Sequence, residues 1–286
     1  MSNIKFSIIT PTYNRAQLLQ RTIKSILAQT FKDWELIIVD DGSTDNTETI
    51  VKNYLDDTRI KYIKKENSGT AHSRNIGAAN AKGEFITFLD SDDEALPHWL
   101  DTVTGHLIPD TGIACAGSIK KLPDGSMVKD YPYEINFYGE KKKVKFTCGS
   151  LFIKRSLFLD IKGFDTKMPT GLLSELGYSL IEQLKDSNLK IVSIEKCLVV
   201  IYFHDGPRLR KDWKSLTVDC ARFVNKFYDY FITWDKSELA RNYAVIAYYN
   251  YKLKQRKESF SYMMKAIRLR PLNIKNYLRV VKYVFI

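Results

Sequence analysis

Long apolar runs, paired cysteines and glycine-rich phosphate loops are all missing from this sequence of 286 residues. No apolar run approaches the roughly 18 residues that span a bilayer. The N-terminal stretch "MSNIKFSIITPTYNR" enters a strand pattern at once, without the regions of a signal peptide. We therefore expect a cytoplasmic protein.

The four cysteines lie far apart and form no C-x-x-C pair, which predicts isolated thiols rather than a zinc site or a disulfide framework. The chain contains neither G-x-x-x-x-G-K-[ST] nor G-x-G-x-x-G, so kinase, GTPase and dinucleotide-binding functions are disfavoured. Hydrophobic residues make up 44% of the chain, which predicts a folded globular protein.

The positive charge is confined to the C-terminal part of the chain. The net charge is +11, and residues 207–286 hold 18 Lys and Arg against 6 Asp and Glu. Residues 1–206 are nearly neutral, with 26 basic and 27 acidic residues. The change near Pro207 predicts a main domain over residues 1–206 and a basic, aromatic-rich helical region over residues 207–286.

Strand-like and helix-like segments alternate over residues 5–120. We expect strands at residues 5–10, 34–40, 59–63 and 84–89, and helices at residues 15–28 and 70–81. A further helix ends near Leu55, with Ser43 or Thr44 as its cap. This order predicts an α/β fold with a mostly parallel sheet that is covered by helices on both faces.

The later part of the chain gives weaker signals. Residues 121–147 mix turn residues with short extended runs, and we expect Lys141 to Lys143 to lie in a solvated loop. The remaining expected elements are a helix at 175–187, strands at 190–194 and 197–203, and helices at 212–232, 236–253, 256–269 and up to the C-terminus.

Polar clusters follow three of the expected strands: "TPTYNR", "DDGS" and "DSDD". Ligands of such sheets bind at the carboxyl ends of the strands, so the clusters should converge on one cleft. Asp90 and Asp92 flank Ser91, and their carboxylates can bind Mg²⁺ or Mn²⁺, which complete their coordination with water and substrate phosphates. A substrate with a diphosphate is implied.

The acidic run taken alone is equally compatible with a solvated loop. It does not match an EF-hand, because Ala95 and Asp101 occupy the positions of the required Gly and Glu.

Four segments together resemble the inverting nucleotide-sugar glycosyltransferases of family 2, which have the GT-A fold. They are "SIITPTYNR", "QTFKDWELIIVDDGSTDNT", "NSGTAHSRNIGAANAKGEFITFLDSDD" and the later "GFD". The resemblance is specific over residues 4–100 and weakens toward residue 210. It implies a Rossmann-like catalytic domain over residues 1–206 and a nucleotide-sugar donor, for which we expect UDP.

The resemblance also implies roles for individual residues. Asp90 and Asp92 would bind the metal, Mn²⁺ or Mg²⁺. The nucleotide would be bound by Pro11, Thr12, Tyr13, Asn14, Asp40, Asp41, Asn67, Gly69, Arg74 and Ser91. Structural alternatives are a surface salt bridge for Arg74 and helix capping for Asp40 and Asp41.

An inverting transfer needs a carboxylate base that accepts the proton of the acceptor hydroxyl. The family places this base in a Glu-Asp pair beyond "GFD", and Ser174 and Glu175 occupy that pair here. We expect Glu175 to be the base and name Asp165 as the second candidate. The non-catalytic alternative for Glu175 is an interaction with the helix dipole.

The stretch "YFHDGPRLR", residues 202–210, supplies three further candidates. His204 is either a third metal or phosphate ligand or a structural histidine. Arg208 and Arg210 are candidates for binding the diphosphate, because the planar guanidinium suits phosphate geometry.

The basic tail contains 16 of the 36 aromatic residues but no nucleic-acid-binding motif, so we expect no nucleic-acid partner. Residues 238–271 resemble one tetratricopeptide-type helix pair, which cannot build a solenoid alone.

The last expected helix is amphipathic. Its basic residues lie beside its apolar ones, namely Lys275, Arg279 and Lys282 beside Ile274, Leu278, Val281 and Phe285. This pattern fits either contact with an anionic membrane, at the inner face of the plasma membrane, or packing on the chain's own domain.

The sequence thus predicts a metal-dependent inverting hexosyl- or N-acetylhexosaminyl-transferase. Its acceptor would be a glycan or a lipid-linked molecule in bacterial-type surface polysaccharide synthesis. A sugar-nucleotide nucleotidyltransferase is disfavoured, because no Gly-rich loop follows the first strand. A non-catalytic scaffold with a degenerate GT-A domain and a partner-binding tail is the other alternative, and the altered Ser174–Glu175 pair favours it.

Overall fold

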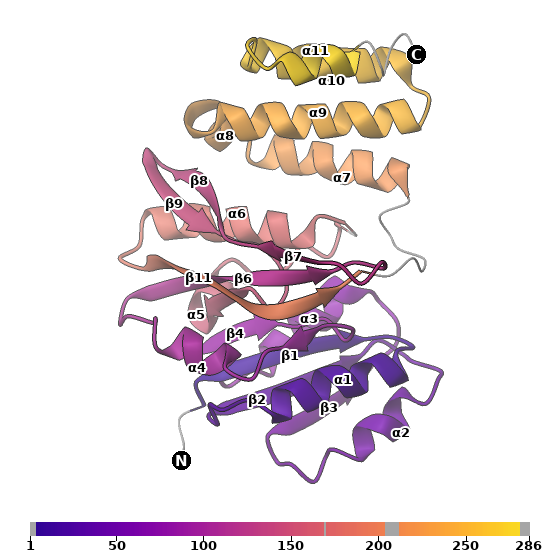
Figure 1. The fold of residues 1–286 in the computed structure, drawn as a ribbon, viewed down its shortest axis with the longest axis vertical. Coiled ribbons are helices and arrows are strands. Elements are labelled where there is room, and N and C mark those ends of the chain that lie inside the picture. Colours follow the sequence, from indigo (N-terminus) through magenta and orange to yellow (C-terminus); the bar gives the residue numbers. More distant parts are fainter. Residues whose placement is uncertain (1–3, 169, 204–211, 281–286) are drawn as a thin grey trace. The chain divides into compact units, whose positions relative to one another are not determined.

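The structure is a computed structural model that describes residues 4–168, 170–203 and 212–280 (Figure 1). The chain forms two compact units. The first comprises Met1–Glu134, Lys142–Thr166 and Leu176–Asp205, and the second comprises Ile135–Lys141, Lys167–Glu175 and Gly206–Ile286. The domain boundary expected near Pro207 stays a prediction.

The first unit is built on a nine-stranded sheet with the order β3-β2-β1-β4-β10-β6-β11-β5, and β7 pairs with β6. The strands are β1 Phe6–Thr12, β2 Trp34–Asp40, β3 Ile60–Lys64, β4 Phe85–Phe88, β5 Glu94–Ala95, β6 Thr111–Lys121, β7 Met127–Asp130, β10 Leu151–Lys154 and β11 Lys190–Tyr202.

The four N-terminal strands pair in parallel, as expected from the β-α-β order: β1 lies between β2 and β4, and β3 flanks β2. β10 is antiparallel to both β4 and β6, whereas β11 is parallel to β6. The α/β class is confirmed, and the antiparallel strand in the middle makes the sheet mixed.

The helices of the chain are α1 Ala16–Leu27, α2 Thr47–Lys52, α3 Thr70–Ala79, α4 Trp99–Thr104, α5 Arg155–Asp160, α6 Leu172–Lys185, α7 Trp213–Lys226, α8 Tyr228–Trp234, α9 Lys236–Lys252, α10 Arg256–Leu269 and α11 Ile274–Val280. A short hairpin is formed by β8 Tyr133–Phe137 and β9 Glu140–Val144.

Strand β1 is buried on both faces because helices cover both sides of the sheet. Ile8 packs with Leu19 and Ile23 of α1 in one core cluster. Ile9 points to the opposite face, where it meets Gly77 of α3. A Cβ on Gly77 would lie 2.4 Å from Ile9 Cγ2, so only glycine lets α3 pack this closely on β1.

The expected cap of α2 was wrong. The helix begins at Thr47 with Asn46 at the N-cap, and neither Ser43 nor Thr44 caps it. Ser43 Oγ instead accepts a hydrogen bond of 2.9 Å from the backbone N–H of Asn14. In the first turn of α2, the backbone N–H of Thr47 donates a hydrogen bond of 3.0 Å to Asp45 Oδ1.

Three other expectations needed correction. The strands expected at 190–194 and 197–203 form one strand, β11, with register shifts at a bulge. The helix expected at 212–232 is divided at Phe227 into α7 and α8. Lys141 to Lys143 lie in strand β9 rather than in a loop.

The second unit is mostly helical. α9 and α10 pack together through a cluster of small and apolar side chains, namely Ala244, Ala247, Met263, Ala266 and Ile267. Within the part of the chain that the structure describes, no helix is long and apolar enough to cross a bilayer.

Candidate active site

A cavity of about 350 Å³ lies at the carboxyl ends of β1, β2 and β4, beside the first turns of α3. All three polar clusters expected to converge there contribute to it. The lining residues are Pro11, Thr12, Tyr13, Arg15, Asp41, Thr70, Ser73, Arg74, Asp90, Ser91 and Asp92. The sequence had assigned no role to Arg15, Thr70 or Ser73.

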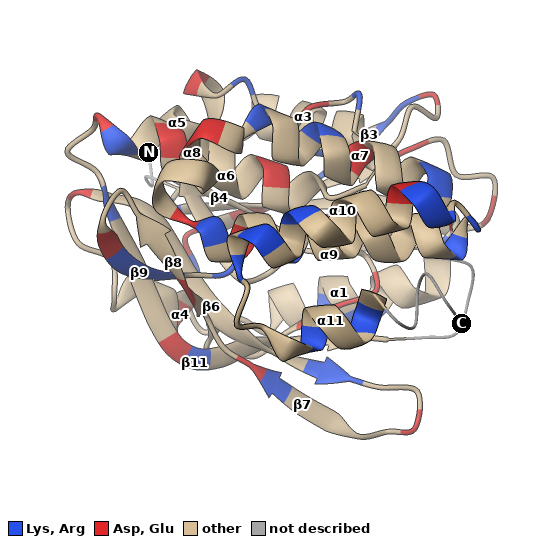
Figure 2. Cartoon of the chain, turned by 90° about the horizontal axis from the view of Figure 1, so that it is seen from above, with Lys and Arg blue, Asp and Glu red and all other residues tan. Residues whose placement is uncertain are grey.

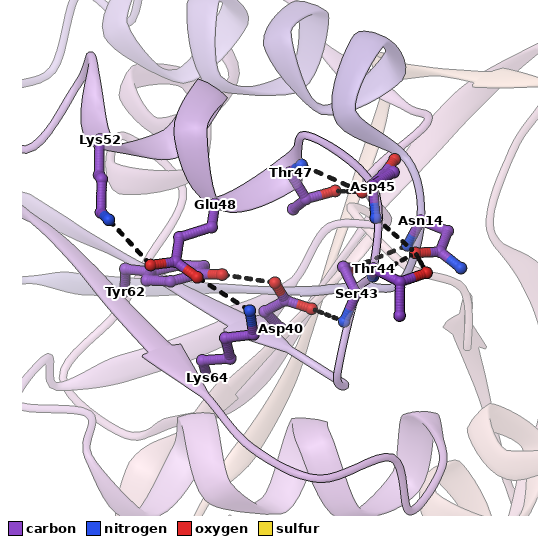
Figure 3. Close-up of polar contacts among 10 residues, drawn as sticks. All are labelled: Asn14, Asp40, Ser43, Thr44, Asp45, Thr47, Glu48, Lys52, Tyr62 and Lys64. Atoms are coloured by element: carbon purple, nitrogen blue, oxygen red, sulfur yellow. Dashed lines mark hydrogen bonds and ion pairs between the residues drawn. The ribbon is translucent and has the colours of Figure 1, made fainter.

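Two predicted nucleotide ligands shape the loop beside the cavity rather than line it. Asp40 accepts hydrogen bonds from the backbone N–H of Ser43, over 2.8 Å, and from the hydroxyl of Tyr62 (Figure 3). Asn14 has a φ of 50°, which asparagine tolerates, and its Oδ1 accepts a hydrogen bond of 2.8 Å from the N–H of Thr44. These bonds fix the loop that follows β2. Their proposed contact with a nucleotide stays a prediction.

Asp41, the next residue, lines the cavity and anchors the segment before α3. Its carboxylate pairs with Lys65 and accepts hydrogen bonds of 2.9 Å from the backbone N–H groups of both Ser68 and Gly69. Burial acts to raise the pKa of Asp41, but Lys65 and the two N–H groups outweigh it and leave the pKa below its usual value. Asn67 and Gly69, two predicted ligands, are not among the described lining residues.

Arg74, which is buried, forms an ion pair in the cavity with Asp90, whose side chain is partly exposed. Arg74 Nη2 lies 2.7 Å from Asp90 Oδ1 and 3.1 Å from the sulfur of Cys148. Burial acts to raise the pKa of Asp90, but the Arg74 charge, its hydrogen bond and the Cys148 thiol together hold the pKa below its usual value. The alternative of a surface salt bridge for Arg74 was wrong about the surface, because only 5% of the residue is exposed. The contact of Arg74 with a nucleotide stays a prediction.

Asp92 is also paired with an arginine. Arg15 Nη1, from the loop after β1, lies 2.6 Å from Asp92 Oδ2. The Arg15 side chain is 37% exposed, so it can move more readily than Arg74. Each predicted metal ligand is thus paired with an arginine. The positive charges offset the repulsion between the neighbouring carboxylates.

The third acid of the run, Asp93, was overlooked as a distinct group. It is 3% exposed, and its Oδ1 accepts a hydrogen bond of 3.1 Å from the backbone N–H of Tyr202 in β11. Burial, followed by the charges of Asp90 and Asp92, raises the pKa of Asp93 to about 8. The hydrogen bond from Tyr202 to Asp93 therefore ties the acidic loop to the sheet.

The donor atoms of the cavity fit a hard divalent cation. Asp90 and Asp92 present carboxylate oxygens around a cavity large enough for phosphate groups, the chemistry that Mg²⁺ and Mn²⁺ prefer. No group of three or more His, Cys, Asp or Glu that could hold a metal occurs among residues 4–168, 170–203 and 212–280. Asp90 and Asp92 would be carboxylate ligands of such an ion, and water or substrate phosphates would complete its coordination.

Thr12, one of the lining residues, has an unsatisfied polar atom. The Thr12 hydroxyl is buried and has no hydrogen-bond partner among the described groups. Such atoms are uncommon in native interiors, since burial without a hydrogen bond is costly.

Glu175 belongs to the second unit and lies in the first turn of α6, as expected. It is 2% exposed and forms an ion pair with Lys226 of α7. Sequence reasoning missed Lys226, which is 51 residues away along the chain. Asp165, the second candidate base, is half-buried in the loop between α5 and α6. His204, Arg208 and Arg210 lie outside the described residues.

The chain matches a known protein family. The profile described as Glycosyl transferase family 2 matches residues 7–159, more than half of the chain. The match includes every residue that lines the cavity.

Related sequences align over about a third of this chain. A GalNAc(5)-diNAcBac-PP-undecaprenol β-1,3-glucosyltransferase of Campylobacter jejuni is 49% identical over 102 residues, which are 35% of this chain and 33% of that protein. A poly(ribitol-phosphate) β-N-acetylglucosaminyltransferase, TarP of Staphylococcus aureus, is 47% identical over 93 residues, or 31% of this chain and 28% of that protein. The matches therefore span a third or less of these relatives.

Solved structures match almost the whole chain. TarS 1-349 of S. aureus in complex with UDP-GlcNAc has a TM-score of 0.64 at 17% identity, covering 98% of this chain and 89% of that one. The mannosyltransferase PcManGT from Pyrobaculum calidifontis, in complex with GDP-Man and Mn²⁺, has a TM-score of 0.58 at 15% identity, covering 98% and 85%. At these identities the likeness shows the fold.

Proposed function

The chain belongs to glycosyl transferase family 2 and has the GT-A fold, and from that premise we propose that it transfers a sugar from a nucleotide diphosphate to an acceptor hydroxyl with inversion. The observation that carries the proposal is the cavity at the strand ends, where Asp90 and Asp92 lie with an arginine each. Such a place suits a diphosphate and its counter-ion.

The reaction exchanges one bond at the anomeric carbon for another. The acceptor oxygen bonds to that carbon while the bond from the carbon to the β-phosphate oxygen breaks, and the nucleoside diphosphate leaves with the electron pair. The proton of the acceptor passes to a carboxylate. The protein must therefore bind the diphosphate, orient the acceptor and supply the base.

Asp90 and Asp92 would hold Mn²⁺ or Mg²⁺, and the bound ion would supply positive charge to the leaving diphosphate. Arg74 keeps Asp90 in place, since it is buried and bonded also to Cys148. Arg15 is the more exposed of the two arginines, and we expect it to exchange Asp92 for a phosphate oxygen when the donor binds.

Glu175 is the proposed base. It is a carboxylate at the start of a helix beyond "GFD", in the second position of the family's acidic pair. Its ion pair with Lys226 must open or shift for Glu175 to accept a proton from the acceptor. The same ion pair is what favours the second candidate function, a non-catalytic scaffold in which Glu175 is only structural.

We propose UDP as the nucleotide and a glycan or lipid-linked acceptor of surface polysaccharide synthesis. TarS in complex with UDP-GlcNAc supports the nucleotide. The relatives named for undecaprenol-linked and poly(ribitol-phosphate) acceptors support the acceptor class. A peripheral position at the inner face of the plasma membrane fits such an acceptor and stays a proposal.

The test is turnover. The full chain is incubated with Mn²⁺, a series of UDP-sugars and undecaprenyl-diphosphate-linked or free oligosaccharide acceptors, while UDP release and the product anomer are followed. The proposal predicts acceptor-dependent UDP release and a product of inverted configuration. Acceptor-dependent release with retained configuration would contradict inversion, and no release with any donor would favour the scaffold.

A further inference from the structure

Apolar side chains are exposed on the last described helix, α11, and just before it. Leu272, which precedes the helix, is 95% exposed, and Ile274 and Leu278 of α11 are 73% and 66% exposed. Tyr277 of α11 is exposed as well. α11 packs on α10, and its buried residue is the polar Asn276, which is 2% exposed. A helix that packs on its own domain normally buries its apolar side chains and exposes its polar ones. In α11 the polar Asn276 is buried, and Ile274 and Leu278 are exposed.

This arrangement differs from one of the two sequence-based expectations. Packing of the apolar face on the chain's own domain is wrong for Ile274 and Leu278. Val280 alone among the described apolar residues of α11 packs against the cluster between α9 and α10. Three exposed aliphatic side chains thus lie within seven residues, a grouping of the kind that marks an interaction site.

The charges around these residues have one sign. The described residues after Glu258 contain no Asp or Glu, and their basic residues are Lys265, Arg268, Arg270, Lys275 and Arg279. Figure 2 shows basic and no acidic segments on α11. Lys275 and Arg279 lie on the same helix as the exposed aliphatic side chains, and their long stems let the charged ends reach past them.

We infer that Leu272, Ile274 and Leu278 insert into the interface of an anionic lipid bilayer, while Arg270, Lys275 and Arg279 bind the lipid headgroups. Exposed aliphatic side chains amid basic ones are the composition of helices that lie in the plane of a membrane. A nucleic acid would match the charges but not the aliphatic side chains. The inference rests on the proposed function in one respect, because a lipid-linked acceptor would require the enzyme to lie at the membrane surface.

The test uses the full chain and vesicles, without donor or acceptor. Co-sedimentation is measured with phosphatidylcholine vesicles and with vesicles containing about 30% phosphatidylglycerol, at low and high salt. We expect binding to the anionic vesicles alone, weakened by salt. The double variant Ile274→Ser/Leu278→Ser should lose binding roughly tenfold or more. Lys275→Gln/Arg279→Gln should bind more weakly and with less dependence on salt.

The matched control is Met127→Ser/Val128→Ser, which removes two exposed apolar side chains from β7 in the first unit. Its vesicle binding should equal that of the unchanged protein. Absence of binding to anionic vesicles, or equal loss in the control, would overturn the inference. Self-association of the unchanged protein that disappears in Ile274→Ser/Leu278→Ser would overturn it in favour of a second copy. Since no turnover is measured, either result leaves the proposed reaction open.

Discussion

Arg74 and Asp90 are joined by a hydrogen-bonded ion pair of 2.7 Å that links helix α3 to the end of β4. The same guanidinium group bonds to Cys148, in the segment before β10. One buried cation thus holds together three elements that surround the cavity. The proposed metal ligand is thereby held in place before any donor binds.

Arg74→Gln should lower the free energy of unfolding by about 1–3 kcal/mol, because a buried charge partner of Asp90 is lost. This loss of stability is smaller than that for a fully buried ion pair, since the Asp90 side chain is 37% exposed. Denaturant unfolding at pH 7 measures the effect. Arg268→Gln, an exposed arginine of α10, is the control and should change stability by less than about 0.5 kcal/mol. Equal stability of both variants would contradict the structural role.

Arg15→Gln should strengthen the binding of Mn²⁺ to the donor-free protein several-fold. Arg15 occupies an oxygen of Asp92 that the metal would use, and its removal frees that oxygen. Isothermal titration with MnCl₂ measures the change, and Arg155→Gln on α5 is the control with the same loss of charge. Unchanged or weaker Mn²⁺ binding in Arg15→Gln would show that Arg15 and the metal do not compete for Asp92.

Glu175→Gln should reduce kcat by about 10²–10⁴-fold, the usual contribution of a general base. Nucleotide binding should be retained. The control is Glu182→Gln, which changes an exposed glutamate on the same helix and should keep full activity. If Glu175→Gln kept normal turnover, the base would have to be another group, and Asp165→Asn would be examined next.

Glu35 predicts a pH-dependent contribution to stability. Its buried carboxylate accepts hydrogen bonds from Ser7, Lys61 and the backbone of Lys82, at 2.5–2.7 Å. Burial acts to raise the pKa of Glu35, but these partners outweigh it and lower the pKa below 4.5. The stabilisation is therefore present above about pH 4.5 and is lost as the pH falls through the lowered pKa.

Glu35→Gln should consequently destabilise the protein by about 1–3 kcal/mol at pH 7, and by less in acid. Thermal unfolding between pH 3 and 7 measures this, with Glu66→Gln, an exposed glutamate, as the control. A loss of stability that did not shrink in acid would contradict the assigned cause.

The sequence was sufficient where local pattern decides structure. The apolar runs of β1 and β2 predicted buried parallel strands, and their polar ends predicted one cavity, which the structure confirms. The predicted cap of α2 was wrong although Ser43 and Thr44 are both favourable cap residues. Both instead form hydrogen bonds with Asn14, which is distant in sequence. Local propensity could not include that contact.

The pairing of side chains could not be predicted for the same reason. Arg15 meets Asp92, and Glu175 meets Lys226, across long stretches of chain that carry no periodic signal. The inverted burial of α11 also required the structure, because its sequence pattern is equally compatible with packing and with exposure. The exposure of Ile274 and Leu278 and the burial of Asn276 distinguish the two.

The most direct measurement is thermal unfolding of the purified protein with UDP, GDP, CMP or dTDP, with and without Mn²⁺, beside the variant Asp92→Asn. A ligand at about 100 times its dissociation constant stabilises the folded state by about 2.7 kcal/mol, which raises the midpoint by several degrees. We expect this rise with UDP and Mn²⁺ together, and its loss in Asp92→Asn. No rise with any nucleotide would contradict the account of the cavity as a nucleotide-sugar site.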